Sequence, residues 1–313
     1  MSISAASLGL RSKLGESEVV FECCDTEFRL RAKGLRASRA VSEARGKAET
    51  LESELDAFDE TSAVSCLNSD GWVESYHVRR VVERGIEYYC LTDGVLDIRH
   101  GEVERQIKSY IRGERSEVDV GSLDGVEGDM EDDVLIEDDE VRVSRDIKLD
   151  LNSLAKGYIV DAALEELDRL GVEGFVDGGG DIATTYPIRV GIESPYPSEK
   201  PLKKIKTDWS IATSGGYRRR RSDVDHIYRP RSDTDTNTDS DAGKVEVGSK
   251  NRSVTVVSER DCTEADALAT AVSALDPDEA IELIEEREGT EAFLVHSGVL
   301  KKTSGFEEHE AET

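Results

Sequence analysis

The sequence predicts an α+β protein, and three observations lead to this class. The chain has 313 residues, which is enough to bury a sizeable core, and apolar periodicity persists along most of it. Segments with helical spacing and segments with alternating spacing both occur. They follow one another in irregular order, without the regular strand and helix alternation of a doubly wound sheet.

The first half of the chain predicts antiparallel strands and amphipathic helices. In chain order we expect a strand or hairpin at 19–31, a charged helix at 37–58, a loop at 62–71, a helix at 75–90 that ends before a turn at 92–94, an acidic surface excursion at 113–132, and a hairpin at 134–144. The turn at 92–94 reads Thr-Asp-Gly, and the hairpin alternates around Asp138 and Asp139.

The second half predicts more strands and two further helices. We expect a short strand at 174–176, strands at 188–192 and 208–213, a mobile loop rich in Asp, Ser and Thr at 231–250, a strand at 253–258, helices at 263–275 and 277–286, a closing strand at 292–296, and a frayed acidic tail from residue 305.

Residues 148–161 predict a strand end that leads into a helix. Asp150 and Asn152 supply capping chemistry, and an apolar stripe then recurs at helical spacing until Gly171. Lys156 falls in the first turn, where the helix dipole already places positive charge. A cation at this end indicates a nearby anion, such as a phosphate held by backbone amides. An exposed lysine on a surface helix is the alternative.

The predicted helix at 263–275 carries a candidate metal site. Asp266 and Thr270 are four residues apart, so both side chains face the same side of the helix. A carboxylate and a hydroxyl are hard ligands that suit Mg²⁺. Thr263 followed by Asp266 is also a capping-box pattern, in which Asp266 would only close the helix start.

Three loops add candidate binding groups. Gly178, Gly179 and Gly180 would let backbone approach a ligand, with Asp181 accepting hydrogen bonds, although a tight turn is the alternative. Thr213 and Ser214 offer hydroxyl donors. Arginines at 218–221 form a cluster that an anionic ligand or simple solvation would explain, and His226 is a candidate proton shuttle or a structural residue.

The charge and the number of cysteines limit the class of partner and the cellular compartment that we expect. With 68 acidic and 40 basic residues the net charge is −28, so we expect no nucleic-acid partner, and a halophilic source is the leading explanation. Five cysteines, an odd number, indicate reduced thiols and a cytoplasmic location. The first 14 residues lack a sustained apolar run, so we expect neither a signal peptide nor a membrane span.

Taken in order, these segments resemble the ApbE-type FAD:protein FMN transferases. The family motif Asp-Leu-Gly-Gly-Ile-Ala-Lys-Gly-Tyr-Ala-Val-Asp matches residues 150–161, its Gly-Gly-Asp-Ile loop matches 179–182, and its Thr-Ser-Gly loop matches 213–215. Further family segments match 55–68, 92–97, 226–231 and 265–270, so the resemblance covers roughly residues 17–300. It implies a mixed sheet and helix domain with the flavin site between its two halves.

The resemblance also implies roles for individual residues. Mg²⁺ would be held by the carbonyl of Ser153 and the side chains of Asp266 and Thr270. Lys156 would lie near the pyrophosphate, with His226 or Asp181 as candidate base. The implied FAD contacts are Cys24, Phe58, Val95, Leu96, Asp97, Asp150, Lys156, Gly179, Gly180, Thr213 and Ser214. Phe58 occupies the aromatic position that packs on the flavin.

Several positions depart from the family pattern. Cys24-Asp25-Thr26 stands where the family has Met-Gly-Thr, Leu96 replaces a phenylalanine, Arg229 replaces an aspartate, and Ser232-Asp233 replaces Thr-Gly. These changes bear on affinity and on the choice of acceptor more than on the metal site.

The implied reaction is a Mg²⁺-dependent transfer of FMN from FAD to a Ser or Thr hydroxyl of an acceptor flavoprotein, with release of AMP. The alternatives are an FAD pyrophosphatase that uses water as the acceptor, and a non-catalytic FAD-binding protein. We expect one domain at 17–304, with the mobile loop at about 231–250, an N-terminal tail at 1–16 and an acidic tail at 305–313.

Overall fold

Strands and helices alternate irregularly along the protein, as a computed structural model shows for residues 11–13, 15–119, 123–144, 146–198, 200–216, 220–222, 224–230 and 245–311. The strands are β1 (Arg11–Lys13), β2 (Glu16–Cys23), β3 (Thr26–Lys33), β4 (Trp72–Glu74), β5 (Val134–Glu137), β6 (Glu140–Val143), β7 (Glu173–Gly178), β8 (Ile182–Thr184), β9 (Ile188–Ile192), β10 (Lys203–Thr207), β11 (Ser210–Ser214), β12 (Arg220–Arg221), β13 (Val224–Asp225), β14 (Tyr228–Pro230), β15 (Val245–Val247), β16 (Ser253–Ser258), β17 (Thr290–His296) and β18 (Val299–Lys302).

The helices are distributed along the whole chain. They are α1 (Ala37–Leu55), α2 (Ala63–Asp70), α3 (Tyr76–Leu91), α4 (Gly101–Ile111), α5 (Met130–Asp133), α6 (Ala155–Arg169), α7 (Cys262–Ser273), α8 (Pro277–Glu285) and a 3-10 helix, η3 (Ser304–His309). In the described part of the chain, no helix is both long and apolar enough to cross a membrane.

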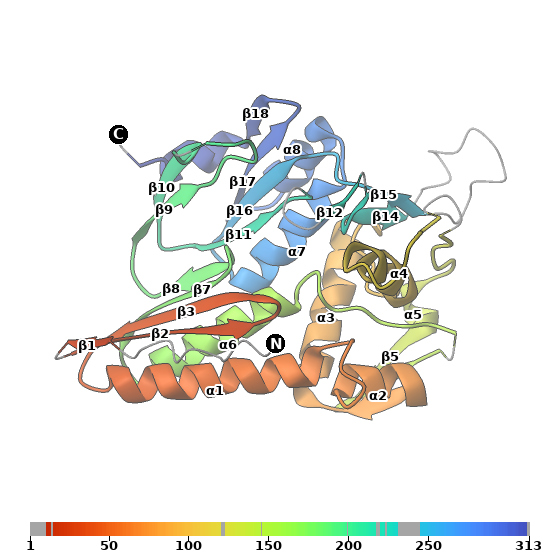
Figure 1. The fold of residues 1–313 in the computed structure, drawn as a ribbon, viewed down its shortest axis with the longest axis horizontal. Coiled ribbons are helices and arrows are strands. Elements are labelled where there is room, and N and C mark those ends of the chain that lie inside the picture. The colour runs from red at the N-terminus through yellow and green to blue at the C-terminus, as the bar shows by residue number, and fades with distance from the viewer. Residues whose placement is uncertain are drawn as a thin grey trace.

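A nine-stranded antiparallel sheet organises the fold (Figure 1). Its order is β1-β2-β3-β7-β8-β11-β16-β17-β18. Helices α1, α6, α7 and α8 cover one face, and the pair β9–β10 together with η3 lies against the other. This mixture of helices and an antiparallel sheet confirms the α+β prediction.

Alternation of side chains along the central strands builds a core on each face of the sheet. In β17, Leu294 points to the helix side, whereas Phe293 and Val295 point to the side covered by β9, β10 and η3. In β16, Val256 and Val257 divide in the same way. Successive side chains of a strand point to opposite faces, so continuous apolar strands are expected where both faces are covered.

Many predicted elements are confirmed. They are the hairpin at 19–31 (β2–β3), the helices at 37–58, 75–90, 263–275 and 277–286 (α1, α3, α7 and α8), the hairpin at 134–144 (β5–β6), and the strands at 174–176, 188–192, 208–213, 253–258 and 292–296 (β7, β9, β11, β16 and β17). The hairpin places Phe21 opposite Phe28, and both side chains are buried.

Two predictions about loops and tails are wrong. Residues 62–71 form helix α2 rather than a loop, because the Ser62 hydroxyl accepts a 3.0 Å hydrogen bond from the Ser65 amide and Gly71 ends the helix in the left-handed conformation. The chain does not fray from residue 305, because Phe306 is fully buried between the sheet and β10. The expected surface excursion is also anchored, since Leu123 and Met130 are buried.

The expected mobile loop falls mainly on residues outside the described ranges. Within its C-terminal part, Val245–Val247 form β15, which pairs with β14. The division of the chain into one domain with two tails stays a prediction.

Candidate functional site

A cavity of about 400 Å³ gathers residues from distant parts of the chain. Most predicted site residues line it, namely Val95, Leu96, Asp97, Asp150, Ser153, Lys156, Gly179, Thr213, Ser214, His226, Asp266 and Thr270. Its volume lies in the usual range of small-molecule sites.

The start of α6 places Lys156 between two carboxylates. Its ammonium forms an ion pair with Asp181, whose side chain is 1% exposed, and lies 4.0 Å from Oδ1 of Asp266. Lys156 is therefore not a simple surface lysine. The predicted cap is wrong, because Asp150 accepts a 2.6 Å hydrogen bond from the amide of Asn152, one turn ahead of the helix, and no side chain caps α6.

Helix α7 presents Asp266 and Thr270 to the cavity from one face. The alternative role of Asp266 as a cap is wrong, because Asp261 caps the helix by accepting a 2.8 Å hydrogen bond from the Glu264 amide. Oδ2 of Asp266 instead accepts a 2.9 Å hydrogen bond from the amide of Gly157 in α6. Only glycine fits there, since a Cβ on Gly157 would lie 2.4 Å from the carbonyl oxygen of Cys262.

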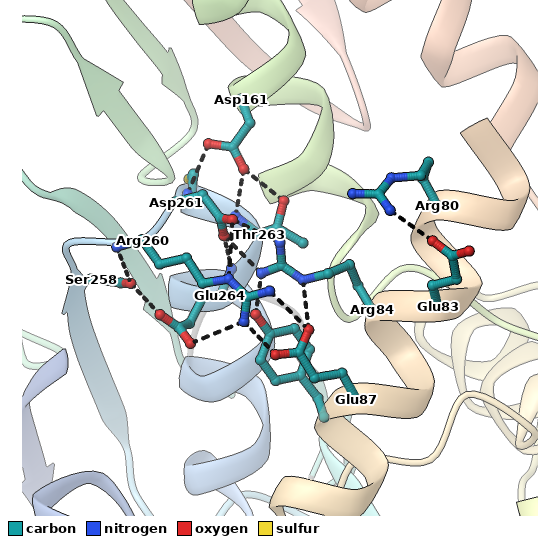
Figure 2. A network of polar contacts seen from close by, with 12 residues as sticks. Arg80, Glu83, Arg84, Glu87, Asp161, Ser258, Arg260, Asp261, Thr263 and Glu264 are labelled. Carbon is teal, nitrogen blue, oxygen red and sulfur yellow. Dashed lines mark hydrogen bonds and ion pairs between the residues drawn. The ribbon is translucent and has the colours of Figure 1, made fainter. Parts of the chain in front are cut away.

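Asp161 joins α6 to the start of α7 (Figure 2). Its carboxylate accepts hydrogen bonds from the amides of Cys262 and Thr263, each of 2.8 Å, and from the Thr263 hydroxyl at 2.6 Å. Desolvation and the nearby Asp261 raise the pKa of Asp161 to about 7, and these three donors oppose the rise. Asp261 in turn binds the guanidinium of Arg84 in α3, so three helices meet at this point.

Buried ion pairs hold Asp97, which lines the cavity next to Leu96. Asp97 is held by the Arg99 guanidinium at 2.8 Å, and Arg99 also reaches Asp133 at 2.8 Å. The neighbouring imidazole of His100 is buried, and its Nε2 lies 3.1 Å from the amide of Val126, which donates to it. Burial lowers the pKa of His100, while Asp97 opposes this shift, so the ring is held neutral.

Four predicted site residues do not line the cavity. Phe58 lies beneath the cations of Lys108 and Arg112, at 5.0 and 4.9 Å from its ring centre. Cys24 sits in the β2–β3 turn beside the lining residues, Asp181 is buried behind Lys156, and the amide of Gly180 donates to Asp177 at 2.9 Å. These residues border the site and contact its lining.

The structure adds lining residues that sequence reasoning missed. They include Asp25, Thr26, Glu104, Lys108, Asn152, Ile227, Tyr228 and Ala271. Glu104 and Lys108 form an i,i+4 ion pair of 2.7 Å in α4, a helix that was not expected, and this spacing was the available signal. Thr26 packs so closely on Gly179 that a Cβ there would lie 2.2 Å from its Oγ1.

The arginine cluster at 218–221 is described only in part, since residues 218 and 219 lie outside the described ranges. The guanidinium of Arg221 donates to the carbonyls of Tyr110 and Arg115 at 2.9 and 2.8 Å. It thereby satisfies one carbonyl at the end of α4 and one in the segment that follows, which favours a structural role for this arginine over anion binding.

Negative charge exceeds positive charge in the cavity wall. Five carboxylates and two lysines line it, and the carboxylates are those of Asp25, Asp97, Glu104, Asp150 and Asp266. Asp266 and Asp181 share the single ammonium of Lys156. A divalent cation would offset this surplus, and the oxygens of Ser153, Asp266 and Thr270 are donors of the kind that Mg²⁺ prefers. The residues present therefore fit a Mg²⁺ ion.

Curated relatives of the chain are FAD:protein FMN transferases. The chain is 26% identical over 283 residues to the FAD:protein FMN transferase of Vibrio cholerae, covering 82% of this chain and 75% of that protein. It is 30% identical over 170 residues to the enzyme of the same name from Treponema pallidum, covering 48% and 44%.

Solved structures share the fold. The ApbE protein of Thermotoga maritima superposes with a TM-score of 0.75 at 23% identity, covering 95% of this chain and all of that one. The flavinyl transferase ApbE of Pseudomonas stutzeri gives 0.75 at 21% identity, covering 99% of this chain and all of that one. The sequence pattern of the ApbE family matches residues 24–294, and the chain therefore belongs to that family.

Proposed function

We propose that this protein is a Mg²⁺-dependent FAD:protein FMN transferase, which moves FMN from FAD to a Ser or Thr hydroxyl of an acceptor flavoprotein and releases AMP. Membership of the ApbE family and the names of its relatives support the transfer of FMN to a protein. The observation that carries the proposal is the convergence of Lys156, Ser153, Asp266 and Thr270 on one cavity.

The reaction breaks the pyrophosphate bond of FAD and forms one phosphoester bond to the acceptor hydroxyl. The acceptor oxygen attacks the phosphorus on the FMN side of FAD, the bond to the bridging oxygen breaks, and AMP leaves with its electron pair. Bound Mg²⁺ would supply Lewis acidity and neutralise phosphate oxygens. The ammonium of Lys156 would bind a pyrophosphate oxygen, and the buried Asp181 would orient that ammonium.

His226 is the better placed of the two candidate bases. It lines the cavity, whereas Asp181 is 1% exposed and already paired with Lys156. An imidazole also titrates near neutral pH, so it suits removal of the acceptor proton.

Val95, Leu96 and Asp97 would line the flavin or adenosine half of FAD, and Thr213, Ser214 and Gly179 would face its other side. Phe58 and Cys24 do not line the cavity, so they would affect the flavin only indirectly, through the lining residues that they contact. The wall is mostly polar and charged, and Val95, Leu96 and Ile227 add apolar side chains to it.

We also propose a reducing, salt-rich cytoplasm as the location. Support comes from the five cysteines in the described part of the chain, none of which forms a disulfide, and from the net charge of −28.

The decisive experiment is intact-protein mass spectrometry of candidate flavoproteins incubated with this protein, FAD and Mg²⁺ in KCl. We expect one FMN on a single Ser or Thr, with AMP release that the acceptor accelerates. AMP and free FMN formed at a rate that no acceptor changes would establish the pyrophosphatase. Bound FAD without any AMP would establish the binding protein.

Lys156→Ala tests the role of the cavity in that assay, and Lys301→Ala is its matched control. Lys301 pairs with the exposed Asp278 in the described structure and does not line the cavity. Loss of FMN transfer in the first variant only is expected. Equal activity in both would remove Lys156 from the mechanism.

A further inference from the structure

Two adjacent cysteines and a glutamate converge behind the β2–β3 turn. Cys23 ends β2, Cys24 lies in the turn, and Glu52 faces them from α1. The ligand atoms of these three residues all lie within 4.8 Å of one another. Among the described residues, no other three His, Cys, Asp or Glu side chains converge in this way.

The distance between the two sulfurs matches the distance between two ligands of the same metal ion. Sγ of Cys23 lies 3.8 Å from Sγ of Cys24. Two thiolates bound to one tetrahedral zinc at about 2.3 Å each are about 3.8 Å apart, because the angle between them is near the tetrahedral value. No movement of the sulfurs toward each other is needed to bind such an ion.

The charge of the cluster favours a cation. No Lys, Arg or His nitrogen of the described residues lies within 4.0 Å of the Glu52 carboxylate. A bound divalent ion would displace the thiol protons and balance the charge of the carboxylate.

The turn is already held in a conformation that presents both sulfurs. Cys24 and Asp25 both have positive φ, 54° and 55°, in the two-residue turn between the paired residues Cys23 and Thr26. This region is unfavourable for cysteine, and it persists only where surroundings hold it. The Glu52 carboxylate stabilises this conformation, because it accepts a hydrogen bond from the Cys24 amide.

We propose that Cys23, Cys24 and Glu52 form a binding site for a thiophilic divalent ion, Zn²⁺, with water as the fourth ligand. Three protein ligands and one open position are a common zinc arrangement. The ion would join the β2–β3 turn to α1. Asp25 of this turn and the adjacent Thr26 line the cavity, so the bound ion would also fix one part of the cavity wall. The site does not depend on the proposed transferase activity.

The test uses the full chain, reduced with a phosphine and stripped of metal, in KCl with excess Mg²⁺. Mg²⁺ occupies oxygen ligands such as Asp266 and the surface carboxylates, but it binds thiolates poorly. Cd²⁺ is then added, and its thiolate charge-transfer absorption in the ultraviolet is followed. We expect one equivalent to saturate the signal and Zn²⁺ to remove it by competition. Absence of this absorption in the reduced protein would overturn the proposal.

Variants assign the signal to the cluster. Cys24→Ser should abolish the saturable absorption, and Glu52→Gln should weaken Cd²⁺ binding while leaving thiolate absorption at high Cd²⁺. Cys90→Ser is the matched control, because Cys90 is an exposed free thiol on α3. An unchanged titration in Cys24→Ser, or an equal loss in Cys90→Ser, would contradict the assignment. Far-ultraviolet circular dichroism shows whether each variant is folded. If Cys24→Ser is unfolded, the Cd²⁺ titration of Glu52→Gln is the test of the proposal.

Discussion

The carboxylate of Asp161 in α6 accepts a hydrogen bond from the backbone amide of Cys262 and another from that of Thr263, each of 2.8 Å. Cys262 begins α7, four residues before Asp266. Lys156 lies in the first turn of α6. The Asp161 carboxylate therefore sets the position of one cavity-lining helix relative to the other.

Asp161→Ala should weaken the fold and misplace the cavity residues. The change leaves two backbone amides without an acceptor, which costs about 1–3 kcal/mol per unsatisfied group when buried. Urea unfolding at pH 8, above the pKa of about 7, measures the free energy of unfolding. Asp168→Ala, an exposed aspartate of the same helix, is the control and should change stability little. Equal stability of both variants would show that the two hydrogen bonds contribute nothing.

Gly157→Ala should separate α6 from α7. The added Cβ would lie 2.4 Å from the carbonyl oxygen of Cys262, and overpacking of this kind costs about 1–3 kcal/mol. Gly46→Ala in α1 is a matched control, because nothing lies within 4 Å of its added Cβ. It should stabilise the protein by about 0.5–1 kcal/mol through helix propensity. Thermal unfolding of both variants gives the comparison, and a shift in the same direction would refute the close contact.

His100 should make the fold sensitive to acid. Its folded-state pKa is lowered by burial, so the unfolded chain binds the proton more readily. Its contribution to stability is present above the unfolded pKa of about 6.5 and is lost as pH falls below it. Unfolding free energies of the wild type and of His100→Gln between pH 8 and pH 5 measure this slope. The difference between them should shrink toward low pH, and a constant difference would exclude His100 as the source.

Asp266→Ala should remove Mg²⁺-dependent turnover and largely preserve the fold. The variant loses the oxygen ligand and leaves the Gly157 amide without its acceptor, at a cost of about 1–3 kcal/mol. AMP release as a function of Mg²⁺ concentration is the measurement, and Asp278→Ala, at a highly exposed position, is the control. Normal turnover of FAD with only a lowered melting temperature would assign Asp266 a purely structural role.

The fold should need concentrated salt, because the chain carries a net charge of −28. Repulsion between carboxylates weakens as the Debye length falls from about 10 Å at 0.1 M to about 3 Å at 1 M. Melting followed by circular dichroism at about 0.1 M and about 2 M KCl tests this. Equal melting temperatures would rule out the halophilic interpretation.

Long periodic elements could be predicted from the sequence, whereas some of the short ones could not. The apolar repeat made α1 and α7 recognisable, whereas α2 has only eight residues and two buried ones, too few to show a period. The acidic residues around Phe306 concealed its burial in η3. Helix α4 begins at a glycine and carries charges on most of its surface, so its stripe of Val103 and Ile107 was missed.

Site residues that belong to a sequence motif could be predicted. Contacts that depend on tertiary packing could not. Lys156, Asp266 and Thr270 belong to contiguous segments that match the family. Asp161 was matched within such a segment, but its contact with α7 depends on residues 101 positions away, which spacing cannot show. The capping residue of α7 is Asp261 rather than Thr263 or Asp266, because helix ends shift by one or two residues from a sequence pattern.

The hydrogen bonds between α6 and α7 span 101 to 109 residues of chain. Contacts of such long range carry a high loop-closure entropy, which slows folding. While the chain is being synthesised, α6 emerges from the ribosome well before α7. During that interval Gly157 and Asp161 of α6 are exposed to water. Other partners can then compete for the surface that α7 later covers.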